Sequence, residues 1–220
     1  MEAFQAAVTF FQSGGLVMYP IALILAVGIA IAIERYIYLS MVRASNRRVW
    51  KRILPLLEVG KFDQALETAI RSRAAISNIL GYGLNRARSR RSSSGEDIQL
   101  AMEEGLLEIV PRLEKRTHYL ATFANIATLL GLLGTIMGLI EAFTAVSGAE
   151  PAAKADLLSA SISVAMNTTA FGLMVAIPLL LAHAVMQTKT SEVVDSLEMA
   201  TVRLTNLITA GSSAPVADAA

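Results

Sequence analysis

The chain has 220 residues, of which 54% are apolar and only 17% are charged, and its mean hydropathy is +0.53. This composition is too apolar for an ordinary soluble protein of this length and indicates a membrane protein. The sequence contains no cysteine, which excludes disulfides, thiol chemistry and cysteine-based metal sites. It also lacks phosphate-binding loops, metalloprotease motifs and nucleophile elbows, so we expect neither an enzyme nor a bound cofactor or metal.

The first long apolar segment spans residues 16–39. It follows a short segment, residues 1–15, that lacks the basic region and the cleavage site of a removable signal peptide. A transmembrane helix needs about 20 mainly apolar residues, and the segment meets that length. Its charged residues, Glu34 and Arg35, stand near its end and are expected at the membrane interface.

Residues 40–118 are predicted to form helices outside the membrane. Apolar residues recur at helical spacing from Trp50 to Arg88. Gly60 and residues 73–75 are expected to be short joints, which would give a helical hairpin or a small bundle. A further helix is predicted to begin at Glu96 and to run on into the next span without a break.

Two more spans follow. Residues 119–147 and 157–187 are each long enough to cross a bilayer, and residues 148–156 form a short link between them. Residues 188–209 continue as an amphipathic helix. The Ala-, Ser- and Pro-rich stretch 210–220 is expected to be a disordered tail.

The positive charge is concentrated in one part of the chain. Of the 19 Lys and Arg residues, 15 lie between Arg43 and Arg116, whereas the link 148–156 has a single Lys. The positive-inside rule therefore places residues 40–118 in the cytoplasm, the N-terminus outside and the C-terminus inside. The basic run Arg86–Arg91 lacks interleaved aromatic residues, so we interpret it as a solvated turn and expect no nucleic-acid partner.

Small residues recur in the second span. Gly131, Gly134 and Gly138 are three and four residues apart, a spacing that lets helices approach closely in a membrane. Helix packing alone would explain these glycines. Thr135 stands among them at mid-span, where it could bond back to the carbonyl of Gly131 or form part of a ring of hydroxyls around an oligomer.

The third span carries two polar or small stripes. Ser163 and Asn167 share one stripe with Ser159, and Thr169 and Gly172 share the other with Ala165 and Ala176. Hydrocarbon cannot satisfy a hydroxyl or an amide, so such groups usually face another helix, a cavity or an ion path. Two such stripes on one span favour a pore or a helix interface over packing alone.

Two sequence motifs in these spans resemble the MotA/TolQ/ExbB proton-channel family, most closely its ExbB branch. They are Leu130-Gly-Leu-Leu-Gly-Thr-Ile-Met-Gly138 and Asn167-Thr-Thr-Ala-Phe-Gly-Leu-Met-Val-Ala-Ile-Pro178. Glu34-Arg35 and Gly60-Lys-Phe-Asp63 fit the same pattern, and the resemblance covers most of residues 16–205. It implies an all-α membrane protein with three spans and long cytoplasmic helical extensions in the bacterial inner membrane.

The resemblance also implies partners and a role. This subunit is expected to form a homopentamer around the transmembrane helices of an ExbD-like partner, which brings a titratable Asp, and to pass force to a TonB-like transducer for transport across the outer membrane. Motif matching places Thr135 and Thr169 on the ion path, with Thr168, Asn167 and Ser163 beside them. Gly131, Gly134, Gly138 and Gly172 would serve helix packing. A neutral hydroxyl can bond a carboxylate and still allow its protonation and release.

Two departures from the family pattern leave the coupling ion open between protons, which we favour, and sodium. Val164 stands where many ExbB and TolQ members carry Glu, and Ala127-Thr128 stands where many have Ala-Pro. Two other hypotheses remain: a non-conducting membrane scaffold, and a Tol- or flagellar-stator-type subunit.

Overall fold

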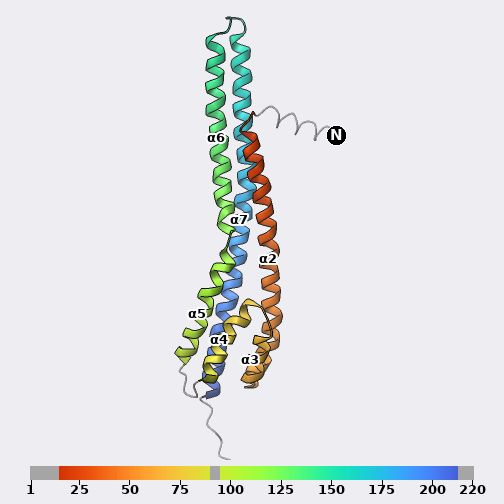
Figure 1. Ribbon diagram of the computed structural model, residues 1–220, viewed down its shortest axis with the longest axis vertical. Coiled ribbons are helices and arrows are strands. Elements are labelled where there is room, and N and C mark those ends of the chain that lie inside the picture. Colours follow the sequence, from red (N-terminus) through yellow and green to blue (C-terminus); the bar gives the residue numbers. More distant parts are fainter. Residues whose placement is uncertain (1–14, 90–94, 213–220) are drawn as a thin grey trace, which may run out of the picture. The chain divides into compact units, whose positions relative to one another are not determined.

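The computed structural model describes residues 15–89 and 95–212, and all of the regular structure in these ranges is helical (Figure 1). The helices are α2 (Met18–Glu58), α3 (Phe62–Ile70), α4 (Ala75–Ser89), α5 (Gly95–Glu114), α6 (Thr117–Ser147) and α7 (Lys154–Ser212). The expectation of an all-α fold is confirmed for the described residues. Helix α7 runs through Pro178 and on to Ser212, and the rest of the predicted tail lies outside the described residues.

Three long helical segments are apolar enough to cross a membrane. They are Met18–Glu58, Gly95–Ser147 and Lys154–Ala210. Few residues of their most apolar stretches are buried within the chain, so most of these side chains face outward. A helix that exposes leucine and isoleucine in this way requires lipid or another protein around it. The chain is therefore a multi-pass membrane protein.

The chain divides into two compact units, which are described separately here. The first unit comprises Met1–Arg35 and Arg116–Met186, and the second comprises Tyr36–Lys115 and Gln187–Ala220. Both α2 and α7 contribute to each unit as unbroken helices. The third crossing of the chain between the units falls between α5 and α6.

In the first unit, α6 and α7 form an antiparallel hairpin (Figure 1). The first part of α2 packs on α7, where Gly28 leaves room for Leu179: a Cβ added to Gly28 would lie 2.5 Å from a methyl carbon of Leu179. The largest buried side chains are apolar and include Met18, Ile21 and Leu120. This packing holds the hairpin that carries the candidate site.

Helices α5 and α6 are separated by a break, whereas the sequence predicted one continuous helix. Arg116 has a φ of 66°, in the left-handed region, and stands directly before the first residue of α6. A non-glycine residue there costs about 1–2 kcal/mol. Within the first unit, the Arg116 guanidinium bonds both carboxylate oxygens of Glu34 at 2.7 and 2.9 Å. This ion pair connects the start of α6 to α2 and compensates part of the conformational cost.

In the second unit, α3, α4 and α5 pack with the C-terminal parts of α2 and α7. Gly105 on α5 allows close contact with α4, because an added Cβ would lie 3.0 Å from the Tyr82 ring and 3.3 Å from the Ile79 Cα. The side-chain oxygen of Asn46 on α2 accepts the Ile76 N–H at the start of α4, at 3.2 Å. These contacts fix the position of α4 within the unit.

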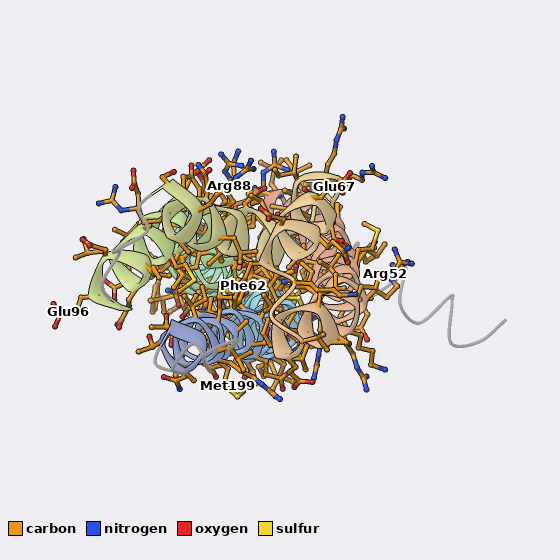
Figure 2. All side chains as sticks on the ribbon, turned by 90° about the horizontal axis from the view of Figure 1, so that it is seen from below. Arg52, Phe62, Glu67, Arg88, Glu96 and Met199 are labelled. Atoms are coloured by element: carbon orange, nitrogen blue, oxygen red, sulfur yellow. The ribbon has the colours of Figure 1, made fainter. Side chains whose placement is uncertain are left out.

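Charged side chains surround the second unit. Figure 2 shows Arg52, Glu67 and Glu96 at its rim, pointing outward. Two ion pairs join α2 to α7 at its surface: Arg43–Glu192 at 2.6 Å and Glu58–Arg203 at 3.0 Å. Exposed pairs of this kind contribute about 0–1 kcal/mol each, so the apolar core of the unit stabilises it more than its charges do.

Candidate ion-pathway site

The site lies at the seam between α6 and α7, where small residues of both helices meet. A Cβ added to Gly172 would lie 2.7 Å from the carbonyl oxygen of Ala127 and 3.0 Å from the Cα of Gly131. A Cβ added to Gly138 would lie 2.7 Å from the Cβ of Ala165. No real Cβ could occupy these positions without a shift of the backbone. The two main chains are therefore in direct contact along the seam.

Thr168 fills the seam opposite Gly134. Its side chain is almost completely buried, and a Cβ added to Gly134 would lie 2.8 Å from the Thr168 Cβ. Its hydroxyl donates to the carbonyl oxygen of Val164 at 3.0 Å. The family resemblance places Thr168 beside Thr169 on the ion path, and in the structure its side chain faces α6 in the middle of the contact.

Thr169 and Thr135 both donate a hydrogen bond to the carbonyl oxygen of Gly131, Thr169 with its hydroxyl and Thr135 with its main-chain N–H. The Thr169 hydroxyl donates to the carbonyl oxygen of Gly131 at 2.8 Å, across the seam. In an α-helix this carbonyl also accepts the N–H of the residue four positions later, which is Thr135. The Gly131 carbonyl thus connects the two residues that the sequence singles out as the ion path.

The Thr135 hydroxyl donates to the carbonyl oxygen of Leu132 at 2.6 Å, and not to Gly131 as the sequence allowed. Both threonine protons are therefore used in hydrogen bonds to the main chain. Each hydroxyl oxygen still has lone pairs that can accept a hydrogen bond or contact a cation. In this arrangement the two oxygens favour water, a protonated carboxyl group or a cation over a carboxylate.

Asn167 and Ser163 lie on the same helix but differ in their surroundings. The antiparallel register, in which Gly134 meets Thr168 and Gly138 meets Ala165, places Asn167 at the level of Thr135. Asn167 is half-buried, whereas Ser163 is exposed and lies one turn nearer the α6–α7 link. Asn167 therefore lies at the height of the two threonines, on another side of α7 from Thr169, and Ser163 lies about one turn away from them.

The described seam is uncharged around the threonines. On α6 the nearest carboxylate along the chain is Glu141, which is exposed and lies six residues beyond Thr135. On α7 the next titratable residue after Thr169 is His183, whose Nδ1 lies 3.0 Å from the carbonyl oxygen of Thr117. Among the described residues no cluster of acidic or imidazole side chains could hold a metal ion. The described parts of α6 and α7 therefore supply no carboxyl or imidazole group at this level.

Sequence reasoning considered the Gly131 carbonyl only as an acceptor for the Thr135 hydroxyl and missed its bond to Thr169 across the seam. A backbone oxygen carries no residue-type signal that would name its partner on the facing helix. The signal was present in the spacing, because Gly131 precedes Thr135 by four residues and faces α7. A glycine at such a position opens the main chain to a hydroxyl on the facing helix.

Comparison with known proteins now decides the family. The model of the MotA/TolQ/ExbB proton channel family matches residues 71–199, which include both motifs and the whole seam. The chain belongs to this family. The match begins in the second unit and ends within α7, at residue 199, so the family relationship includes parts of both units.

Individual MotA/TolQ/ExbB relatives place the chain near the ExbB branch. It is 31% identical to the biopolymer transport protein ExbB-like 1 of Synechocystis over 84% of this chain and 72% of that protein. It is 29% identical to the biopolymer transport protein ExbB homolog of Methanothermobacter thermautotrophicus over 89% and 68%. The Tol-Pal system protein TolQ of Haemophilus influenzae is 37% identical over 38% and 36%. The resemblance recognised from the motifs is confirmed.

Proposed function

We propose that this chain forms the wall of an ion path in an inner-membrane, ion-driven motor. Five copies would surround the transmembrane helices of an ExbD-like partner, whose titratable carboxyl group would pass the threonine level of each α6–α7 hairpin. Movement of the partner would then drive a TonB-like transducer in transport across the outer membrane. Family membership and the three apolar helices support this role.

The observation that carries the proposal is the shared Gly131 carbonyl. This carbonyl accepts the Thr169 hydroxyl and, within α6, the main-chain N–H of Thr135, while the Thr135 hydroxyl donates to Leu132. Both hydroxyl protons are thus engaged, and each hydroxyl oxygen keeps its acceptor capacity in an uncharged part of the hairpin. A carboxyl group that has just bound a proton can donate to such an oxygen, whereas a carboxylate gains nothing from it. The wall would therefore stabilise the neutral form of the partner's carboxyl group. A fixed charge at this level would instead trap the carboxyl group in one state.

One observation favours a second candidate, a non-conducting scaffold. Both threonine hydroxyls have main-chain acceptors within the chain, and the glycines fit helix packing without any ion. A scaffold needs only these contacts. The ion path requires the threonine oxygens to contact an ion or a carboxyl group, whereas the scaffold does not. A measurement of ion flux therefore distinguishes the two candidates.

The test is ion flux in liposomes that contain this protein co-purified with its ExbD-like partner, under a proton gradient and then under a sodium gradient. We expect proton flux that Thr169→Ala abolishes and Thr169→Ser retains. Thr144→Ala is the control for loss of a threonine hydroxyl outside the seam, because Thr144 is an exposed α6 threonine that bonds back to its own helix, at 2.8 Å. Flux carried by sodium instead of protons would identify sodium as the coupling ion. An intact complex with no flux of either ion would favour the scaffold.

A further inference from the structure

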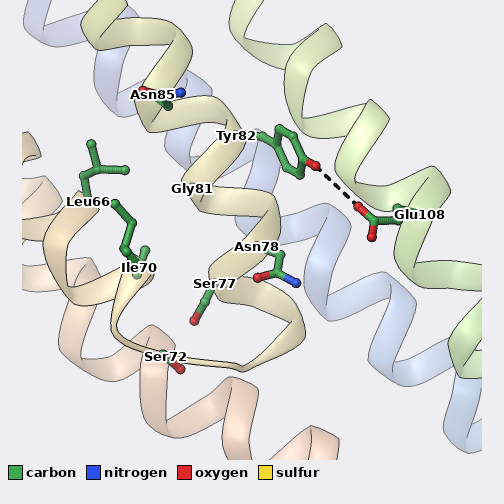
Figure 3. A pocket seen from close by; sticks show the side chains of 10 residues that line it. Leu66, Ile70, Ser72, Ser77, Asn78, Gly81, Tyr82, Asn85 and Glu108 are labelled. Atoms are coloured by element: carbon green, nitrogen blue, oxygen red, sulfur yellow. Dashed lines mark hydrogen bonds between the residues drawn. The ribbon is translucent and has the colours of Figure 1, made fainter.

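The second unit contains a cavity of about 540 Å³ that lies wholly outside the seam of α6 and α7. It opens between α3, α4 and α5 (Figure 3). Leu66 and Ile70 of α3 form an aliphatic wall, and α4 forms the opposite, polar wall. Ile70 is 73% exposed, although it is a large apolar side chain. A cavity of this size can hold a short peptide or a molecule of similar volume.

The polar wall contains a buried hydroxyl that lacks a partner. Ser77 is only 3% exposed, lines the cavity, and has a side-chain oxygen with no hydrogen-bond partner among the described residues. In Figure 3 this hydroxyl points towards the connection between α3 and α4. A buried polar group without a partner is costly to the folded state, so it indicates a place where a ligand can bond.

Gly81 lets a ligand approach the backbone of α4. A Cβ added to Gly81 would meet nothing within 4 Å, so the space in front of this residue is open. Asn78 and Asn85 line the cavity on the two sides of Gly81. A side-chain amide donates and accepts at once, as a peptide group does. Together, the Ser77 hydroxyl, the side-chain amides of Asn78 and Asn85, and the open space in front of Gly81 suit the peptide groups of a polypeptide main chain.

The charge of the lining excludes an anionic ligand. Glu108 is the charged residue among those described around the cavity, and no cationic side chain lines it. The Glu108 carboxylate accepts from Arg112 at 2.6 Å and from the Tyr82 hydroxyl at 3.4 Å, so its charge is largely compensated. An anion would find no positive group in the lining and, beside it, only Arg112, which already bonds Glu108, and a cation would find a carboxylate that already has partners. The walls therefore select an uncharged ligand.

We propose that this cavity binds an uncharged, extended segment of polypeptide from a partner protein. Its aliphatic side chain packs on Leu66 and Ile70, and its main-chain amide groups bond Ser77, Asn78 and Asn85. The proposal concerns the second unit and does not depend on ion conduction through the first. In this proposal the helices outside the predicted spans recruit a partner protein.

The experiment uses the full-length protein in lipid nanodiscs with labelled isoleucine methyl groups, and Ile70→Val assigns the Ile70 signal. The probe is the capped tripeptide acetyl-Gly-Leu-Gly-amide, and its counterpart is acetyl-Gly-Asp-Gly-amide. We expect the leucine peptide to shift the Ile70 signal saturably, with roughly tenfold tighter binding than the aspartate peptide. Ser77→Ala should weaken the leucine peptide by roughly three- to tenfold.

Two phenylalanine variants provide the control. A Cβ at Gly81 meets nothing within 4 Å and a non-glycine residue improves helix propensity, so Gly81→Phe should fold, occupy part of the cavity and lose the saturable shift. Gln64→Phe places the same side chain at an exposed position of α3 outside the cavity and leaves binding unchanged. The proposal is overturned by the absence of a saturable Ile70 shift, by equal binding of the aspartate peptide, or by undiminished binding to Gly81→Phe.

Discussion

The hydroxyl of Thr169 on α7 donates to the main-chain carbonyl oxygen of Gly131 on α6, at 2.8 Å. This bond crosses between two helices in an apolar region, and it ends on a carbonyl that already accepts the N–H of Thr135 in the α6 helix. The bond can form because Gly131 has no side chain to hold α7 away. This one hydrogen bond therefore contributes to the packing of the hairpin and lies at the level of the candidate ion path.

Removal of the Thr169 hydroxyl should weaken the hairpin slightly. Thr169→Val keeps the shape of the side chain and loses the bond to Gly131, which should lower the free energy of unfolding by about 1 kcal/mol. Thr169→Ser keeps the donor and should stay within about 0.5 kcal/mol of the wild type. Reversible unfolding of the three proteins in detergent measures the difference. Equal stability of the valine and wild-type proteins would mean that the bond contributes nothing.

Thr135→Val tests the acceptor role directly. Its hydroxyl bonds back to Leu132 within α6, so its loss should change stability by less than about 0.5 kcal/mol. Ion flux through the complex with the ExbD-like partner should nevertheless fall strongly, because one acceptor oxygen disappears from the wall. Thr144→Val, measured in the same liposomes, should leave flux intact. Full flux in Thr135→Val would remove this residue from the ion path.

A methyl group at Gly134 should separate the helices. The new Cβ would lie 2.8 Å from the Thr168 Cβ, so Gly134→Ala should destabilise the protein by about 1–3 kcal/mol through overpacking. Gly148→Ala is the control, because Gly148 follows α6 with a φ of −102° and an added Cβ meets nothing within 4 Å. Melting temperatures in the same detergent compare the two variants. A similar loss in both would show that the seam is not tightly packed.

Substitutions at Arg116 should separate backbone strain from the ion pair. Arg116→Gly relieves the left-handed conformation and loses the pair with Glu34, two effects of about 1 kcal/mol and opposite sign. We expect near-neutral stability. Arg116→Val keeps the strain, worsens it through β-branching, and loses the pair, so it should cost about 2–3 kcal/mol. The order of the two variants in chemical denaturation is the result to check, and the reverse order would contradict the assigned conformation.

Asn46→Ala should loosen the start of α4. The Asn46 side chain is buried and accepts the N–H of Ile76 at 3.2 Å, so its loss leaves that donor unsatisfied at a cost of about 1–2 kcal/mol. Hydrogen exchange should speed up at the first turn of α4 and remain unchanged at the amides of α6. Uniform acceleration over the whole chain would instead indicate global destabilisation.

Helix type and rough extent follow from the sequence because long apolar segments and helical periodicity report burial in lipid or in a small core. Gly60 interrupts the helices as predicted, after α2, whereas the second joint, predicted at residues 73–75, covers residues 71–74, since Ala75 already belongs to α4. The break at Arg116 was not predictable, since arginine is a good helix former and nothing in its identity indicates a left-handed conformation. It depends on the tertiary contact with Glu34.

The site was predictable in residue type but not in orientation. The family resemblance placed Thr168 beside Thr169, yet neighbouring residues on a helix point about 100° apart, and only the register with α6 shows that Thr168 faces Gly134. The direction of each hydroxyl proton also depends on which carbonyl lies within reach: the sequence suggested Gly131 as an acceptor for Thr135, whereas the structure has Leu132. Roles on the ion path stay predictions until flux is measured.

The close contact between the main chains of α6 and α7 has a mechanical consequence. Ordinary helix pairs slide past one another by small side-chain adjustments, but here Gly172 lies against the backbone of Ala127 and Gly131, and the Thr168 side chain is held against Gly134. Relative sliding of the two helices would first require them to separate. The α6–α7 hairpin is therefore expected to move as one rigid body.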